Sequence, residues 1–159
     1  ALTGHLVLST LHTNDAPSAV TRLIDMGIPP FLVASTVQGI LAQRLVRRVC
    51  PSCRLTDNAT PEERAFLGPP EATQLIRSTG CDKCHGTGFF GRVGLFELLV
   101  VTDQIRHLIV EKASASVIRA AAVRDGMRIL RQDGCAKIRE GSTTVAEVLR
   151  SVTEEAAHG

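Results

Sequence analysis

Two closely spaced cysteine pairs constrain this chain more than any other feature. The segments "CPSC" (50–53) and "CDKC" (81–84) each carry two thiols three positions apart. Structural zinc binds four thiolates in a tetrahedron, and two tight turns that each offer two sulfurs can provide this geometry with little surrounding structure. We therefore predict a structural zinc site, and its four ligands are Cys50, Cys53, Cys81 and Cys84.

Basic residues near both pairs support the zinc interpretation. Four thiolates around one divalent cation leave an excess of negative charge, which nearby cations can offset. The candidates are Arg47, Arg48, Arg54 and Lys83. This basic cluster therefore needs no nucleic acid to explain it. Residues 54–80 form a longer spacer than the about 15–20 residues of a zinc ribbon, so we expect a metal-clipped excursion from the main body.

Other interpretations of the cysteines stay open at this point. The segment "CDKCH" (81–85) has the C-x-x-C-H pattern of c-type haem attachment, which would leave Cys50 and Cys53 unexplained. The segment "CDKCHGTG" (81–88) also resembles one unit of the J-domain chaperones, although those units recur in arrays. A redox C-x-x-C pair normally opens a helix after a strand, and neither pair clearly does. Cys135 lies among apolar residues, so we expect a small core residue rather than a nucleophile.

Bulk composition argues against several classes of function. The chain has 159 residues, of which 44% are hydrophobic, so it can bury a core of ordinary domain size. Its 18 basic and 16 acidic side chains give a net charge of +2, too small to indicate nucleic-acid binding. The sequence has neither an apolar run of about 20 residues nor a signal peptide. These features favour a cytosolic protein, in which paired cysteines more often bind metal than form disulfides.

A strand followed by a helix is expected near the start of the chain. The run "LVLSTL" (6–11) is short, apolar and rich in strand-forming residues, which predicts a buried parallel strand. His12 follows at the end where ligands bind in open parallel sheets. Asp15 and Pro17 are suited to begin a helix, and Gly27 is suited to end it. Because the sequence has no initiator methionine and opens on an apparent internal junction, we expect it to belong to a longer chain.

Periodicity and capping signals predict the remaining elements. Apolar residues at helical spacing predict a second core helix from Phe31 to Leu45. Segments 44–50 and 91–101 are expected to be strands that pair antiparallel at the base of the cysteine region. The rest is helical, and we expect it to form a small bundle. Its capping signals are Thr102, Ser114 or Ser116, Gly141 and a capping box from Thr144 to Glu147.

Four segments together resemble one known family. They are "TGHLVLSTLHTNDAPSAVTRLIDMGIPPFLVAS", "LAQRLVRRVCPSC", "CDKCHGTGFFGRVGLFELL" and "GMRILRQDGCAKIREGSTTVAEVLR". In this order they resemble the carboxyl-terminal end of the secretion ATPases of type II secretion and type IV pilus systems. The resemblance covers nearly the whole chain, and the residues of these segments are most similar to those of the type II secretion ATPases.

The resemblance implies a fold, an activity and partners. The fold would be α/β: the C-terminal part of a RecA-like P-loop ATPase core, with a tetracysteine zinc-binding insertion and a C-terminal helical bundle. The longer protein would be a cytoplasmic, hexameric motor, peripherally associated with the inner membrane. It would use ATP and Mg²⁺ to drive pseudopilus assembly for protein secretion. Its partner would be the cytoplasmic domain of an inner-membrane secretion component.

Individual residues match motifs of this family. The segment "TGHLVLSTLH" (3–12) matches its histidine box, so the resemblance implies that His12 is a catalytic, phosphate-sensing residue. His5 is the other histidine of this nucleotide-binding box, and we expect its role to be structural. Arg22 matches an arginine that could offer charge to phosphates at a subunit boundary; a surface pair with Asp25 is the alternative. The four cysteines match the family's zinc-binding element.

The predicted segments are residues 1–49 for the trailing part of the nucleotide-binding core, 50–90 for the zinc element, and 91–159 for a strand and a helical subdomain. No stretch matches the G-x-x-x-x-G-K-[ST] P-loop, whose backbone cradles phosphates, and the acidic Walker B residues are missing too. We therefore expect that this chain cannot hydrolyse ATP alone. A free-standing zinc-binding interaction module is the alternative, and it leaves the predicted strand ending at His12 unexplained.

Overall fold

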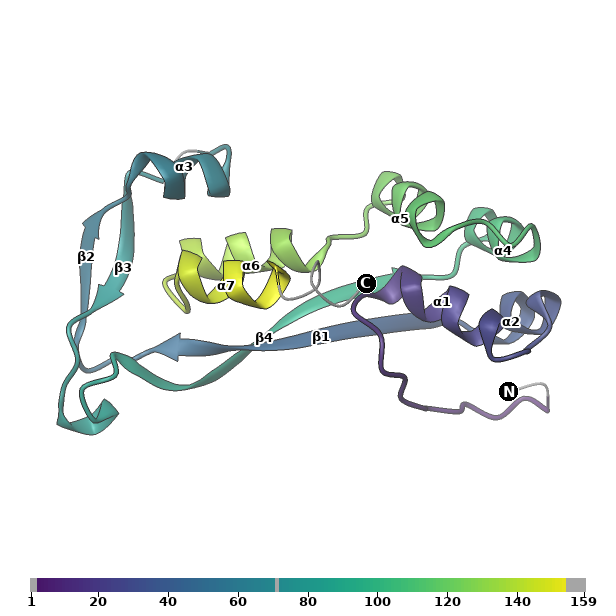
Figure 1. Ribbon diagram of the computed structural model, residues 1–159, viewed down its shortest axis with the longest axis horizontal. Coiled ribbons are helices and arrows are strands. Elements are labelled where there is room, and N and C mark those ends of the chain that lie inside the picture. Colours follow the sequence, from purple (N-terminus) through teal and green to yellow (C-terminus); the bar gives the residue numbers. More distant parts are fainter. Residues whose placement is uncertain (1–2, 71, 154–159) are drawn as a thin grey trace. The chain divides into compact units, whose positions relative to one another are not determined.

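The computed structural model describes residues 3–70 and 72–153, a mixture of helices and antiparallel strands (Figure 1). In chain order the elements are α1 (Ala16–Asp25), α2 (Pro30–Thr36), β1 (Gly39–Val49), β2 (Arg54–Asn58), α3 (Pro61–Leu67), β3 (Gln74–Ser78), the 3-10 helix η1 (Asp82–Cys84), β4 (Phe89–Val100), α4 (Asp103–Val110), α5 (Ala115–Arg124), α6 (Leu130–Arg139) and α7 (Val145–Thr153). Within the described residues, none of these helices has both the length and the apolar character needed to cross a membrane.

Contacts divide the chain into two compact units. The first contains Ala1–Gln43 and Phe96–Ile129, and the second contains Arg44–Leu95 and Leu130–Gly159. The expected helical tail is therefore split, because α4 and α5 belong to the first unit and α6 and α7 to the second. A single bundle of all four helices was a wrong expectation. The three functional segments 1–49, 50–90 and 91–159 stay a prediction.

Two antiparallel strand pairs organise the chain. β1 and β4 are hydrogen-bonded neighbours, and so are β2 and β3. The N–H of Val101 donates to the carbonyl of Gln38 (3.0 Å), and that of Cys50 donates to the carbonyl of Gly88 (2.9 Å). Each bond joins the start of one strand to the end of the other, so β1 and β4 run antiparallel, as predicted for segments 44–50 and 91–101. β2 and β3 pair from Arg54 opposite Ser78 to Asn58 opposite Gln74.

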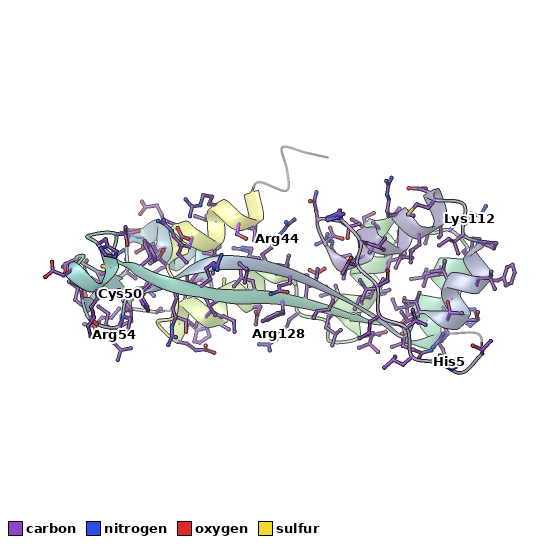
Figure 2. All side chains as sticks on the ribbon, turned by 90° about the horizontal axis from the view of Figure 1, so that it is seen from below. His5, Arg44, Cys50, Arg54, Lys112 and Arg128 are labelled. Atoms are coloured by element: carbon purple, nitrogen blue, oxygen red, sulfur yellow. The ribbon has the colours of Figure 1, made fainter. Side chains whose placement is uncertain are left out.

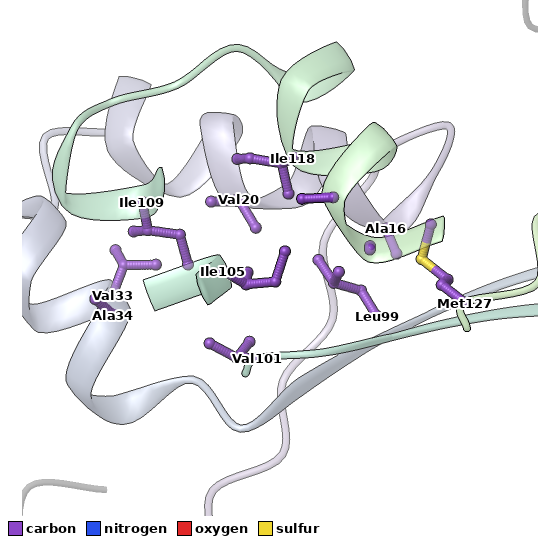
Figure 3. Packing of buried hydrophobic residues seen from close by; sticks show 12 residues of the cluster. Ala16, Val20, Val33, Ala34, Leu99, Val101, Ile105, Ile109, Ile118 and Met127 are labelled. Atoms are coloured by element: carbon purple, nitrogen blue, oxygen red, sulfur yellow. The ribbon is translucent and has the colours of Figure 1, made fainter. Parts of the chain in front are cut away.

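The core of the first unit lies between α1, α2, α4 and α5 (Figure 3). Its largest fully buried side chains include Ile105, Ile109 and Ile118. Local capping sets the helix starts: the side chain of Thr102 accepts from the N–H of Ile105 at the start of α4. Ser114 caps α5 in the same way. The sequence predicted both caps, which satisfy backbone donors that have no partner within the helix.

The core of the second unit forms where α6 and α7 pack together with residues of β1, β3 and β4. Leu95, Ile138 and Val148 are almost completely buried there. Gly134 of α6 permits the close approach of α7, because a Cβ atom at this position would lie 2.5 Å from Cγ1 of Val148. Cys135 is buried in this core, as predicted, and burial raises the pKa of its thiol.

The expected buried strand at residues 6–11 is not present. These residues form no strand, and Leu6 and Leu8 are 84% and 88% exposed. A parallel strand has to pair its backbone with a neighbouring strand, and the described residues contain only the two antiparallel pairs. The apolar composition of this segment therefore has no sheet here in which to be buried.

The expected helix from Phe31 to Leu45 is also wrong over most of its length. α2 ends at Thr36, and the chain is extended from Val37, where ψ is 123°. In β1, Ile40 and Ala42 pack against the first core while Leu41 is exposed, which is the two-residue alternation of a strand. The apolar spacing fitted both periods, and Gly39, a poor helix former, lies where the helix fails.

Replacing Gly134 with alanine is expected to destabilise the second unit. Alanine favours a helix by about 1 kcal/mol, but overpacking a core costs about 1–3 kcal/mol. Val148 is β-branched and has one preferred rotamer in a helix, so it cannot easily turn away. Urea unfolding should therefore show a lower free energy of unfolding for Gly134→Ala.

The double variant Gly134→Ala/Val148→Ala is the control for this clash. It should lose clearly less stability than the sum of the two single changes. Strict additivity would mean that the two side chains do not compete for the same space.

Candidate metal centre

Two tight turns carry the four cysteines. One turn follows the end of β1, and the other precedes the start of β4. Cys50 directly follows β1, and its turn leads into β2. In the second pair, Cys81 directly precedes η1 and Cys84 is the last residue of η1, which comes shortly before β4. The hydrogen bond from the N–H of Cys50 to the carbonyl of Gly88 ties the two turns together. Figure 2 shows Cys50 and Arg54 close together at this end of the strands.

The sulfur positions fit a tetrahedral metal site. The Sγ atoms of Cys50 and Cys81 are 3.9 Å apart, those of Cys53 and Cys84 3.8 Å, and those of Cys81 and Cys84 3.7 Å. All four Sγ atoms lie within 4.8 Å of one another. Zinc–sulfur bonds of about 2.3 Å in a tetrahedron require sulfur atoms about 3.8 Å apart. A disulfide would need about 2.05 Å, and all the cysteines are free.

Backbone N–H groups point at one of these sulfurs. The N–H groups of Cys81 and Gly88 donate to Sγ of Cys84 at 3.1 and 3.3 Å. Burial opposes ionisation of Cys84, but these hydrogen bonds and those from neighbouring thiols lower its pKa to about 6. Burial raises the pKa of Cys53 to about 12. The hydrogen bonds from these backbone N–H groups favour a thiolate at Cys84, and the thiolate is the form of cysteine that binds a metal ion.

A glycine permits this arrangement. Gly88 has a φ of 76°, and a Cβ atom there would lie 2.3 Å from Oγ of Ser78. Glycine at position 88 of the "CHGTG" segment (84–88) therefore lets a backbone N–H reach Sγ of Cys84. This role explains the glycine without a chaperone-type repeat or a haem. Since all four thiols converge, the haem interpretation, which uses only Cys81 and Cys84, does not account for the site.

An ion pair that the sequence did not predict lies beside the cluster. Glu147 of α7 is 4% exposed, and its carboxylate accepts from the guanidinium of Arg47 (2.6 Å) and from that residue's backbone N–H (3.1 Å). Burial opposes ionisation of Glu147, but these hydrogen bonds and the nearby charge of Arg150 lower its pKa. Half of the predicted capping box is present, because Oγ1 of Thr144 accepts from the N–H of Glu147. The carboxylate of Glu147 instead holds β1.

The predicted nucleotide-binding residues belong to the other unit. His5 is exposed and shares a hydrogen bond with Thr3 (2.9 Å), and His12 and Arg22 are also exposed. His12 lies in the irregular segment before α1, and Arg22 lies on α1. The structure brings the four cysteines together in one cluster. The roles of His5, His12 and Arg22 stay predictions.

The start of α1, just after His12, is held by two carboxylates. Asp15 accepts from the N–H of Ser18 (2.7 Å) and forms an ion pair with Arg119. Glu97 of β4 is almost completely buried and accepts from the N–H of Ala16 (3.0 Å). The cap at Asp15 was predicted from the sequence. The contacts of Glu97 and Arg119 were not, because both residues are distant in the chain and carry no local signal.

Comparisons with known proteins place the chain in one family. The family model described as "Type II/IV secretion system protein" matches residues 1–150, so the chain belongs to this family. The sequence-based resemblance is thus confirmed.

Type II secretion proteins and type IV pilus ATPases are about equally similar to this chain. The chain is 50% identical over 157 residues to the type II secretion system protein E of Pseudomonas aeruginosa, covering 98% of this chain and 31% of that protein. It is 49% identical over 158 residues to the type IV pilus assembly ATPase PilB of Thermus thermophilus, covering 97% of this chain and 18% of that protein. The type II secretion system ATPase E of Vibrio cholerae is 47% identical over 157 residues, which are 98% of this chain and 31% of that protein. The chain therefore spans less than a third of the length of these relatives.

Replacing Cys81 with serine is expected to unfold the cysteine region locally. The four cysteines could hold a metal ion, and metal bound there would cross-link the two ends of segment 50–90 and supply folding free energy. Limited proteolysis should cut the Cys81→Ser variant within 50–90 at least about tenfold faster than the parent protein loaded with zinc. A Glu140→Gln variant, altered at an exposed position outside the cluster, should keep the parent's resistance there. Equal resistance in Cys81→Ser would contradict a structural role for the cluster.

The ion pair of Glu147 predicts a pH-dependent contribution to stability. Its pKa is lower in the folded state than in the unfolded state, so its contribution is fully present above the unfolded pKa and lost as pH falls through the folded pKa. At pH 7, Glu147→Gln should lower the free energy of unfolding by about 1–3 kcal/mol. This difference should shrink as the pH is lowered through the acidic range. Glu140→Gln changes an exposed residue and should have little effect; a pH-independent difference for Glu147→Gln would contradict the ion-pair explanation.

Proposed function

We propose that this chain is the carboxyl-terminal portion of an ATPase that powers type II protein secretion by driving pseudopilus assembly. The observation that carries the proposal is the family match over residues 1–150. Relatives that are 50% and 49% identical to the chain are named as type II secretion system protein E and as type IV pilus assembly ATPase. A RecA-like nucleotide-binding core, of which residues 1–49 would be the trailing part, follows from the same resemblance.

In this proposal, His12 senses the terminal phosphate of ATP, and Arg22 offers positive charge to phosphates at a subunit boundary. Both side chains are exposed, and the segment that carries His12 runs directly into α1, whose start is fixed by Asp15 and Glu97. His5 would have a structural role in the same box. ATP and Mg²⁺ would bind in the complete protein, because the 159 residues contain no P-loop.

The four cysteines would hold one structural zinc ion. Their sulfur atoms have the separations of a tetrahedral site, and thiolate is a donor that zinc prefers. The ion would supply folding free energy to residues 50–90, where β2 and β3 form a short two-stranded antiparallel sheet. Four protein ligands leave no open position, so the zinc would be structural rather than catalytic.

The assembly that we propose is a homo-hexamer on the cytoplasmic side of the inner membrane, docked to the cytoplasmic domain of an inner-membrane secretion component. This location and these partners rest on the resemblance alone. The small net charge of +2 argues against nucleic acid as a partner.

A type IV pilus assembly ATPase is the second candidate. It is favoured by the PilB relative of Thermus thermophilus, whose identity of 49% is almost the same as the 50% of the type II relative. Identity therefore does not choose between the two systems. A free-standing zinc-binding module is the remaining alternative, and it predicts no contribution to ATP turnover.

Chimeric proteins can test the motor assignment. In one, this chain replaces the matching 157 residues of the Vibrio cholerae type II secretion system ATPase E; in the other, it replaces the matching 158 residues of the PilB relative. We expect the first chimera to hydrolyse ATP and to restore secretion in a strain lacking the native ATPase. Restoration of pilus assembly alone, by the second chimera, would support the second candidate. Two chimeras that fold but do not hydrolyse ATP would contradict the motor proposal.

Replacing His12 in the active chimera tests its assigned role. His12→Ala should lower kcat by about 100-fold, as expected when a preorganised group near the developing charge is removed. His107→Ala removes another exposed histidine, on α4, and should leave kcat near the parent value. The unfused 159-residue chain should show no ATP turnover. Equal effects of the two substitutions would contradict a role for His12 in sensing phosphate.

A further inference from the structure

We infer that Arg47, locked in place by Glu147, is a positioning residue that aligns the two cysteine turns for metal binding. This inference rests on the proposed zinc site and goes beyond it, because it assigns metal affinity to residues of α7 and the loop before it that are not ligands. Three sets of contacts in the second unit carry it.

The first set joins the end of β1 to residues 142–147. The carbonyl of Arg47 accepts from the hydroxyl of Thr143 (2.8 Å), and its N–H donates to Glu147 (3.1 Å). Two residues further on, the N–H of Val49 donates to the carbonyl of Ser142 (3.0 Å). The backbone is therefore fixed up to the residue before Cys50. The position of the first sulfur ligand thus depends on the start of α7.

The second set reaches the other cysteine turn through the Arg47 side chain. The Cζ atom of its guanidinium lies 4.1 Å from the centre of the Phe89 ring. Phe89 follows Gly88, whose carbonyl accepts from the N–H of Cys50 and whose N–H donates to Sγ of Cys84. Arg47 belongs to β1, which leads into the first cysteine turn, and its side chain contacts Phe89, which follows the second cysteine turn.

The third set holds the arginine itself. Glu147 accepts from the Arg47 guanidinium at 2.6 Å and from Arg150 at 2.5 Å, and it is buried. Because a buried carboxylate needs charged partners, Glu147 fixes the direction in which Arg47 extends. Metal binding and docking of α7 onto β1 are thereby coupled, and such coupling is reciprocal.

Charge alone would predict a different pattern of metal affinity. Arg48 is next to Arg47, carries the same charge and is exposed, so a purely electrostatic effect on the thiolates would be similar for both residues. Removing the negative charge of Glu147 would strengthen thiolate and metal binding if only charge mattered. If Glu147 acts by positioning Arg47, the same substitution weakens metal binding. The sign of the effect therefore separates the two explanations.

The experiment measures the zinc dissociation constant of the whole chain by competition with a chromophoric chelator. The variants are Arg47→Met, Glu147→Gln and Thr143→Val, and the matched control is Arg48→Met. We expect each of the first three to weaken zinc binding by at least about fivefold, and Arg48→Met to change it by less than about twofold. Thr143→Val removes one hydroxyl and keeps the side-chain shape. It therefore tests the hydrogen bond to the Arg47 carbonyl even if circular dichroism shows that a charge variant is unfolded.

Two results would overturn the inference. One is equal weakening by Arg47→Met and Arg48→Met together with tighter binding by Glu147→Gln, which would show that charge decides the affinity. The other is unchanged affinity in folded Glu147→Gln and Thr143→Val proteins, which would show that these residues stabilise α7 only. If the parent protein itself binds no zinc, the proposed metal site fails, and this result is distinct from both.

Discussion

The convergence of four cysteine sulfurs is the constraint on which the second unit depends. Segments 50–53 and 81–84 are brought together because β1 ends, and β4 begins, on the same side of an antiparallel pair. The backbone hydrogen bond between Cys50 and Gly88 closes this end of the pair. In the described part of the chain between the turns, β2 and β3 are two paired strands of five residues each, and the seven-residue helix α3 lies between them in sequence. In the proposed zinc site, a metal cross-link between the two turns would supply folding free energy to this segment.

Packing of the last two helices completes this unit. Gly134 lets α6 approach Val148 of α7, and α7 in turn places Glu147 against Arg47. In addition, the guanidinium of Arg139 of α6 donates to the carbonyl of Leu67 at the end of α3 (2.7 Å). The carboxyl-terminal helices thus contact residues on both sides of the first cysteine pair in sequence. Residues of β1, α3, α6 and α7 thus belong to one connected set of contacts in this unit.

Local signals in the sequence predicted local features well. Asp15 and Thr102 cap helices as expected, because a cap depends on neighbours within three residues. The cysteine spacing predicted the cluster, because zinc chemistry restricts such pairs strongly. The helix expected from Phe31 to Leu45 was wrong, since its apolar residues fitted a strand as well. Partners distant in the chain, such as Arg47 and Glu147, left no pattern that the sequence alone could show.

The most direct test of a metal-ordered chain is X-ray absorption at the zinc edge, on protein purified without added metal and without chelator. The account predicts about one zinc ion per chain with four sulfur neighbours at about 2.3 Å and no nitrogen or oxygen neighbour. A protein without zinc that is fully folded over residues 50–90, or a zinc ion with nitrogen or oxygen ligands at about 2.0 Å, would contradict it.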